Sequence, residues 1–271
     1  MREVDLEKVK IHFNVVCIGA GGTGGNFLKE FGRYMSFFRD ANKSITLSIV
    51  DGDHVENKNR ERQPYLNIDE NQPKSVTLAN AIIENFGLSE DSVRAYNCYI
   101  NNKAELYNIV NRAKKYYNSA YSLYREIIVL IGAVDNHRAR QVMDGFFYME
   151  NDIIYIDAAN EYRVGEVCIG IRMNGKNITP PRSHYFPDIL KDKSPSKSEL
   201  SCGVVNESDP QHLTTNLMAA NICLCSVVNL IHGTVQGGIV YFDSSKMFSR
   251  FDLFTGKCPS QKKRGVKKCV K

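Results

Sequence analysis

The sequence predicts an α/β fold: a Rossmann-like, doubly wound, mostly parallel sheet that ends in antiparallel strands. Three observations favour it. Strand and helix patterns alternate over residues 13–157. The strand patterns are apolar on both faces, as expected when helices cover both sides of a sheet. The first strand pattern ends in a glycine-rich run, residues 19–25, which leads directly into a helical pattern.

Hydrophobic periodicity places each element. Short continuous apolar runs predict buried strands, and apolar residues at i, i+3 and i+4 predict helices. The expected strands are residues 13–18, 45–50, 93–100, 127–131 and 152–157, and the expected helices lie at about 27–35, 74–86, 104–117 and after 136. Strands that alternate with helices in this way pair in parallel.

The pattern changes after residue 157. Residues 166–173 alternate like a half-buried strand, and residues 174–210 lose periodicity, which predicts a long crossover loop rich in proline. A helix restarts near Thr214, and two strands, 237–243 and 248–254, close the fold. We therefore expect one domain over residues 1–256 and a flexible basic tail over 257–271.

Composition excludes several classes of protein. The net charge of +5 comes from the tail, where seven Lys/Arg and no acid leave the rest of the chain nearly neutral, so no nucleic-acid partner is expected. No apolar run approaches twenty residues and the N-terminus lacks a signal region, which predicts a cytoplasmic protein without a membrane partner. Eight irregularly spaced cysteines fit reduced thiols better than a disulfide scaffold.

The glycine-rich turn predicts a nucleotide site. Gly19, Gly21, Gly22 and Gly24 would let the backbone approach a phosphate at the N-terminus of the next helix, although a structural tight turn is the alternative. Asp51 ends the second strand, where an acid binds the ribose hydroxyls. Asp53 is a second candidate ribose ligand, or else a residue that caps the loop.

Four polar residues follow these acids. Asn59, Arg62, Gln63 and Lys74 supply two cations and two amides, which suit a polyphosphate and the charge that builds on a leaving pyrophosphate. A nicotinamide dinucleotide needs no such set. Each residue alone is more often an ordinary surface residue, so the prediction depends on the set.

Asp135 and Asn136 follow the central apolar strand. An acid at this end of a parallel strand is placed to bind Mg²⁺ that bridges phosphates. The alternative is a helix N-cap, for which both residue types are favoured. Arg140, one turn into the following helix, is expected to make structural ion pairs.

Together these motifs resemble the ThiF/MoeB/ubiquitin-activating (E1-like) superfamily, and most of all bacterial ThiF-like adenylyltransferases. The resemblance covers about residues 13–160 and rests on G-x-G-G-x-G at Gly19, D-x-D-x-V at Asp51, N-x-x-R-Q at Asn59, Q-P-K ending at Lys74, and D-N-x-x-x-R at Asp135. It implies adenylation of the C-terminal carboxylate of a ubiquitin-like or sulfur-carrier protein with ATP and Mg²⁺. By motif, Asp51 corresponds to the ribose ligand, Asn59, Arg62 and Lys74 to the triphosphate ligands, and Asp135 to the magnesium ligand.

The resemblance also implies a candidate acceptor thiol, since many members transfer the acyl group to a cysteine in the crossover loop. Cys202 lies in that region, and His184 and His212 in the same segment could lower its pKa. Its placement resembles proteins that work with a conjugating-enzyme-like carrier. The alternative is an ordinary loop residue.

Two departures from the family pattern stand out. The chain has no CxxC pair, so we predict no zinc, and only Arg2 precedes the first strand as a source of the arginine that relatives lend to a partner subunit. The resemblance implies a homodimer. Two other functions remain as alternatives: a catalytically silent E1-like scaffold and an NAD(P)-dependent oxidoreductase, although residues 160–271 offer the latter no convincing catalytic acid or base.

Overall fold

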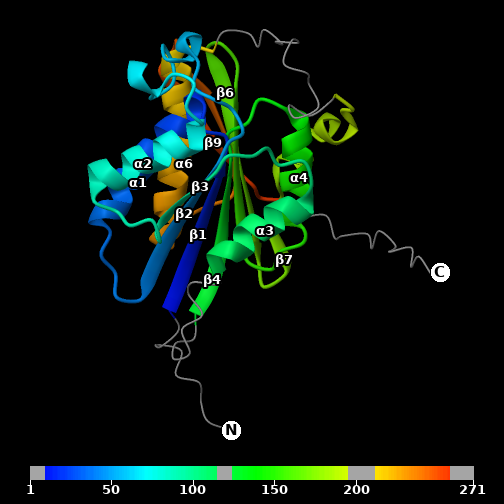
Figure 1. Cartoon of the computed structure of the whole chain (residues 1–271). Helices are drawn as coiled ribbons and strands as arrows, with labels where there is room; N and C mark the ends of the chain where they lie inside the picture. Colours follow the sequence, from blue (N-terminus) through cyan, green and yellow to red (C-terminus); the bar gives the residue numbers. More distant parts are fainter. Residues whose placement is uncertain (1–9, 115–123, 195–210, 257–271) are drawn as a thin grey trace, which may run out of the picture.

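The computed structural model describes residues 10–114, 124–194 and 211–256 and confirms the predicted fold class (Figure 1). The strands are β1 (Lys10–Ile18), β2 (Lys43–Val50), β3 (Val93–Tyr96), β4 (Tyr124–Gly132), β5 (Ile153–Asn160), β6 (Val164–Met173), β7 (Lys176–Thr179), β8 (Gly238–Asp243) and β9 (Phe248–Leu253). The helices are α1 (Gly22–Phe37), α2 (Lys74–Phe86), α3 (Lys103–Lys114), α4 (His137–Phe147), α5 (Arg182–Tyr185) and α6 (Leu213–Ile231), with short 3₁₀ helices η2 (Asn57–Asn59), η3 (Asn67–Asp69) and η4 (Pro187–Lys191).

In the described residues these strands form one sheet in the order β3-β2-β1-β4-β5-β6-β8-β9, with β7 paired to β6. Strands β1 to β5 pair in parallel, and every pairing from β5–β6 onward is antiparallel. The change of direction follows from the connections, because β5 joins β6 through a short turn, whereas the parallel strands need helical crossovers.

Helices cover both faces of the sheet and separate two apolar cores (Figure 1). Helices α1, α2 and α6 pack on one face through residues such as Phe27, Leu78 and Cys223. Helices α3 and α4 cover the other face through residues such as Leu106 and Phe146. Burial on both faces explains the continuous apolar runs in the parallel strands.

The chain reverses its winding at β1, which lies between β2 and β4. In an open α/β sheet, ligands bind outside the carboxyl ends of the strands at such a switch point. The glycine-rich turn begins there: the Gly19 amide donates to the Val50 carbonyl, and the Ala133 amide donates to the Ile18 carbonyl. We call this region the carboxyl edge.

Two expected elements differ from the structure. The third strand ends at Tyr96 rather than near residue 100, because the Cys98 amide turns back to the Tyr96 carbonyl. Residues 174–210 are not wholly irregular, since Asn174 and Gly175 adopt positive φ and turn the chain from β6 into β7, and α5 and η4 follow. Residues 195–210 lie outside the described part of the chain, as does the predicted basic tail.

The apolar strand and helix patterns around Cys17, Cys168, Cys223 and Cys225 predict core thiols. Cys17, Cys168 and Cys223 are buried, but Cys225 is exposed, so its prediction as a core thiol is wrong. Residues two positions apart point to opposite sides of a helix, so only one sulfur of the Cys223–Cys225 pair can face the core. Helix α6 is also long and apolar enough to cross a membrane, but half of the tested window is buried, as in a core helix.

Candidate functional site

The glycine-rich turn packs closely against the backbone that follows β4. Gly19 has φ of +97°, and a Cβ there would lie 2.3 Å from the Ala133 carbonyl oxygen. A Cβ on Gly24 would lie 1.9 Å from the Gly19 carbonyl oxygen. Only glycine fits these two positions, so the turn brings the N-terminus of α1 close to the carboxyl edge. The first-turn amides there can bind an anion.

Asp51 connects this turn to the loop that follows β2. Its Oδ2 accepts from the Ala20 amide at 2.6 Å, and its Oδ1 accepts from the Asp53 amide at 2.8 Å. Burial, and then the neighbouring Asp53 carboxylate, raises the pKa of Asp51. Each carboxylate oxygen keeps a further lone pair that could accept from a ribose hydroxyl.

Lys74 opens α2 and is almost fully buried. Its ammonium lies 3.3 Å from Asp53 Oδ2, and the Tyr99 hydroxyl donates to Asp53 Oδ1 at 2.5 Å. Partial burial, then this hydrogen bond and the charges of Asp53, Asp51 and Asp135, raises the pKa of Tyr99. Asp53 therefore does more than cap the loop, because it pairs with Lys74.

Arg62 and Gln63 approach the turn from the loop between β2 and α2. Arg62 Nη1 donates to Gln211 Oε1 at 3.1 Å. Gln63 is buried next to Gly21, and its Oε1 has no hydrogen-bond partner among the described residues. An orphaned buried acceptor costs free energy unless a ligand or water completes it.

Asp135 and Asn136 divide the two roles that the sequence left open. Asn136 is the N-cap of α4, where its side chain accepts from the Ala139 amide at 2.8 Å. Asp135 is exposed, one residue before the cap. It follows the carboxyl end of β4, so it lies at the same edge of the parallel sheet as Asp51, which follows β2.

The structure thus gathers five segments at the carboxyl edge, and we call this set the carboxyl-edge cluster. It contains the glycine turn of Gly19, Gly21, Gly22 and Gly24, together with Asp51, Asp53, Arg62, Gln63, Lys74, Tyr99 and Asp135. Cations, carboxylates and helix-terminal amides together can orient and neutralise a polyphosphate.

Two expected site residues fall outside the description: the side chain of Asn59 and all of Cys202 lie outside the described part of the chain.

The two histidines expected near Cys202 contact other groups. His184 packs edge-on against Tyr185 and Phe254, and His212 is the N-cap of α6, with a ring nitrogen 2.7 Å from the Thr214 hydroxyl. In the described residues, no group of three or more His, Cys, Asp or Glu side chains forms a metal cluster.

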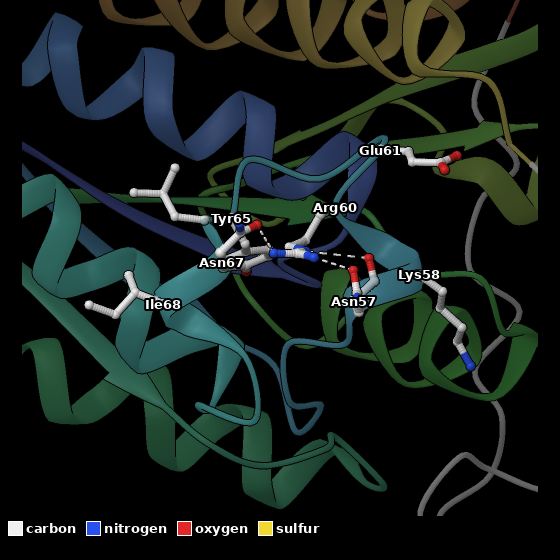
Figure 2. A pocket seen from close by; sticks show the side chains of 8 residues that line it. Asn57, Lys58, Arg60, Glu61, Tyr65, Asn67 and Ile68 are labelled. Carbon is white, nitrogen blue, oxygen red and sulfur yellow. Dashed lines mark hydrogen bonds between the residues drawn. The ribbon is translucent and has the colours of Figure 1, made fainter.

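A hollow of about 1010 Å³ is lined by residues of the loop between β2 and α2 (Figure 2). Arg60 crosses it and donates to the side-chain oxygens of Asn57 and Asn67. Tyr65 lies between the hollow and the turn, since its hydroxyl donates to the Ala20 and Lys74 carbonyls. The other lining residues are Lys58, Glu61, Leu66 and Ile68.

A second charged group, which we call the buried ion cluster, lies beneath α5. Asp157 is 1% exposed and lies 3.4 Å from Arg140 Nε and 3.7 Å from Arg182 Nε. Arg182 also pairs with Glu166 and packs over the Phe186 ring. The expected structural ion pair of Arg140 is thereby confirmed.

Several site residues escaped the sequence analysis. Tyr99 follows β3 and Asn160 ends β5, which is the signal that identified Asp51, whereas Gln211 lies just before α6. Asn160 ends β5, accepts from the Thr23 hydroxyl and donates to Asn216. Polar residues at strand ends are common, so this signal alone does not select them.

The sequence matches a family of known proteins: the family model described as "ThiF family" matches residues 2–262. Among solved structures, E. coli MccB with AMPCPP and MccA is similar at 17% identity and a TM-score of 0.59, over 94% of this chain and 66% of that one. E. coli MccB with ATP is similar at 15% identity and a TM-score of 0.58, over 89% and 63%.

PaaA is similar at 18% identity and a TM-score of 0.57, over 89% of this chain and 63% of that one. The chain therefore spans about two thirds of the length of these structures, or slightly less. At these identities the likeness shows the fold. No curated protein matches the sequence significantly.

Proposed function

Because the chain belongs to the ThiF family, we propose that it is an ATP-dependent adenylyltransferase. It activates the C-terminal carboxylate of a ubiquitin-like or sulfur-carrier protein. The observation that carries the proposal is the carboxyl-edge cluster, where Arg62, Lys74 and Asp135 come from three separate segments to one end of the sheet. E. coli MccB, a structural relative, has been crystallised with ATP and with AMPCPP and MccA, which supports a nucleotide at this edge.

The reaction needs positioning and charge neutralisation rather than a strong base. A carboxylate oxygen attacks the α-phosphorus of ATP, the bond from that phosphorus to the bridging oxygen breaks, and pyrophosphate leaves. Asp51 holds the ribose, and the first-turn amides of α1 bind a phosphate. Arg62 and Lys74 neutralise the charge that develops on the pyrophosphate.

Mg²⁺ fits the donors at the carboxyl edge. Magnesium is usually held by one or two carboxylates together with substrate phosphates and water. Asp135 is an exposed carboxylate that follows the carboxyl end of β4, so it could supply such a ligand at the same edge as Asp53. When bound, the ion would supply positive charge that offsets the negative charge of the phosphates.

A second step is proposed for Cys202. Its thiolate would attack the acyl adenylate, form a thioester and release AMP, before transfer to a conjugating-enzyme-like carrier. In Cys202→Ala, adenylate formation should persist while any reductant-sensitive adduct with the substrate protein disappears. An adduct that remains in this variant would move the acceptor to another thiol. We also propose a homodimer and a single adenylation domain over residues 1–256.

Calorimetry tests the proposed function without knowledge of the partner protein. The purified chain is titrated with ATP and with NAD, each with and without Mg²⁺. The proposal predicts ATP binding that magnesium strengthens. NAD binding without ATP binding would assign the chain to the oxidoreductases, and binding of neither nucleotide would favour the silent scaffold.

A further inference from the structure

Arg62 is held by a neutral partner at the carboxyl edge. Its Nη1 donates to Gln211 Oε1 at 3.1 Å, and among the described residues it makes no ion pair with a carboxylate. Lys74 differs, because Asp53 lies 3.3 Å from its ammonium. The guanidinium of Arg62 is thus oriented without being neutralised.

The Gln211 amide has only one workable orientation. Its Oε1 faces a guanidinium, which can only donate, and its Nε2 donates to the Asn160 carbonyl at 3.3 Å, which can only accept. Exchanging the oxygen and nitrogen would set donor against donor and acceptor against acceptor. Both ends of the amide are therefore specified by the structure.

Asn160 connects this amide to the rigid part of the fold. Its Nδ2 donates to Asn216 Oδ1 at 2.8 Å, and its Oδ1 accepts from the Thr23 hydroxyl at 3.0 Å. Asn216 is fully buried on α6, and Thr23 lies in the first turn of α1. A chain of hydrogen bonds thus runs from Arg62 to the helix that begins at the glycine turn.

We propose that Gln211 is a positioning residue, which holds Arg62 toward the β- and γ-phosphates of ATP while leaving its charge intact. This inference rests on the proposed function, because it deepens the role of Arg62 in that site. An unrestrained arginine loses side-chain entropy when it is fixed on a ligand. A residue that fixes it beforehand removes part of that cost.

The chemistry of the side chain gives the proposal a distinctive prediction. Glutamate has the shape of glutamine, so Gln211→Glu keeps an acceptor beside Arg62 but adds a negative charge. It also replaces the N–H donor to the Asn160 carbonyl by an acceptor, so a merely structural contact would lose thermal stability at that end, gain an ion pair with Arg62 at the other, and leave the ATP affinity unchanged. If Gln211 positions Arg62 for ATP, Gln211→Glu should instead lower the ATP affinity, because a guanidinium that is paired with a carboxylate attracts a polyphosphate less strongly.

The experiment is calorimetric titration of the full chain with Mg-ATP and with AMP, which lacks the phosphates that Arg62 serves. We expect Gln211→Ala to weaken ATP binding about tenfold with AMP binding unchanged, and Gln211→Glu to weaken it at least as much. Arg62→Ala should lose more, and adding Gln211→Ala to it should cost nothing further, because Gln211 acts through Arg62. The exposed Gln236→Ala is the matched control and should bind both nucleotides like the wild type.

Three results would overturn the inference. The first is an unchanged ATP affinity in Gln211→Ala. The second is an equal loss of affinity for ATP and AMP. The third is a further loss of ATP affinity when Gln211→Ala is added to Arg62→Ala, as large as the loss in Gln211→Ala alone. Thermal melting of each variant separates misfolding from a local effect, and the isosteric Gln211→Glu guards against a loss of packing. Failure of the proposed function looks different, since the wild type itself would then bind no ATP.

Discussion

Two groups of charged residues lie at the same sheet, and their burial and pairing differ. In the buried ion cluster, Asp157 is enclosed by Arg140 and Arg182, and all three side chains are at least nine-tenths buried. In the carboxyl-edge cluster, Asp135 is exposed, and among the described residues Arg62 is held by a neutral amide and pairs with no carboxylate. We infer from this difference that the buried ion pairs hold the fold, whereas the charge of Arg62 is available to a ligand.

Breaking the buried ion cluster should have the largest effect. Arg182→Ala leaves Arg140 as the one charged partner of Asp157 among the described residues and releases α5 from β6, so the free energy of unfolding should fall by about 3 to 5 kcal/mol. Urea denaturation measures this loss. The exposed pair of Asp188 and Lys191 is the control, and Lys191→Ala should leave the free energy of unfolding nearly unchanged. Equal losses in the two variants would show that the buried ion cluster is no structural anchor.

His12 sharpens the comparison, because it is a titratable side chain that is only 2% exposed within β1. Its ring bonds the Ser44 and Thr46 hydroxyls, and burial together with the charge of Arg94 lowers its pKa to about 4. An unfolded histidine titrates near 6.5, so the unfolded chain binds the proton first as pH falls. Stability is fully present above pH 6.5 and is lost toward pH 4.

The loss should reach about 3 kcal/mol at pH 4, read from urea denaturation across this pH range. In His12→Gln that part of the pH dependence should disappear. The exposed His232→Gln should retain the wild-type profile. A profile that His12→Gln leaves unchanged would assign the acid sensitivity to other groups.

The smallest effect is expected at Asp135, where exposure makes the structural cost low. Asp135→Asn should remove the strengthening of ATP binding by Mg²⁺, about tenfold, and should leave the free energy of unfolding nearly unchanged. Asn136→Ala is the matched neighbour: it loses the cap of α4, should cost about 1 kcal/mol of stability and should keep the magnesium response. A retained magnesium response in Asp135→Asn would remove this residue as the metal ligand.

The sequence predicted the parallel half of the fold well, because buried strands and amphipathic helices leave clear periodicities. Helix α2 begins at Lys74 and ends at Phe86, as expected. The short β7 was missed, since it has four residues, of which only Thr179 is buried, and carries no such period. Its pairing depends on a hairpin turn at Asn174 and Gly175 and on contact with β6.

The site was predicted in part for a similar reason. Motif residues such as Asp51 and Lys74 sit next to glycine, proline or strand ends, which mark their positions in the chain. Gln211 and Asn160 could not be paired with Arg62 from the sequence, because their contacts join segments 149 and 51 residues apart. Such contacts exist only after the sheet has brought distant strands together.

The central claim is that the carboxyl-edge cluster binds the phosphates of ATP, and the most direct test is a Mg-ATP titration of Lys74→Ala beside the wild type. We predict an ATP affinity at least about a hundredfold lower in the variant, with AMP binding little changed, since the ammonium acts on the leaving phosphates. Lys191→Ala, which changes an exposed lysine, should bind like the wild type. ATP affinity that Lys74→Ala leaves intact in a folded protein would contradict the assignment of this edge as the phosphate site.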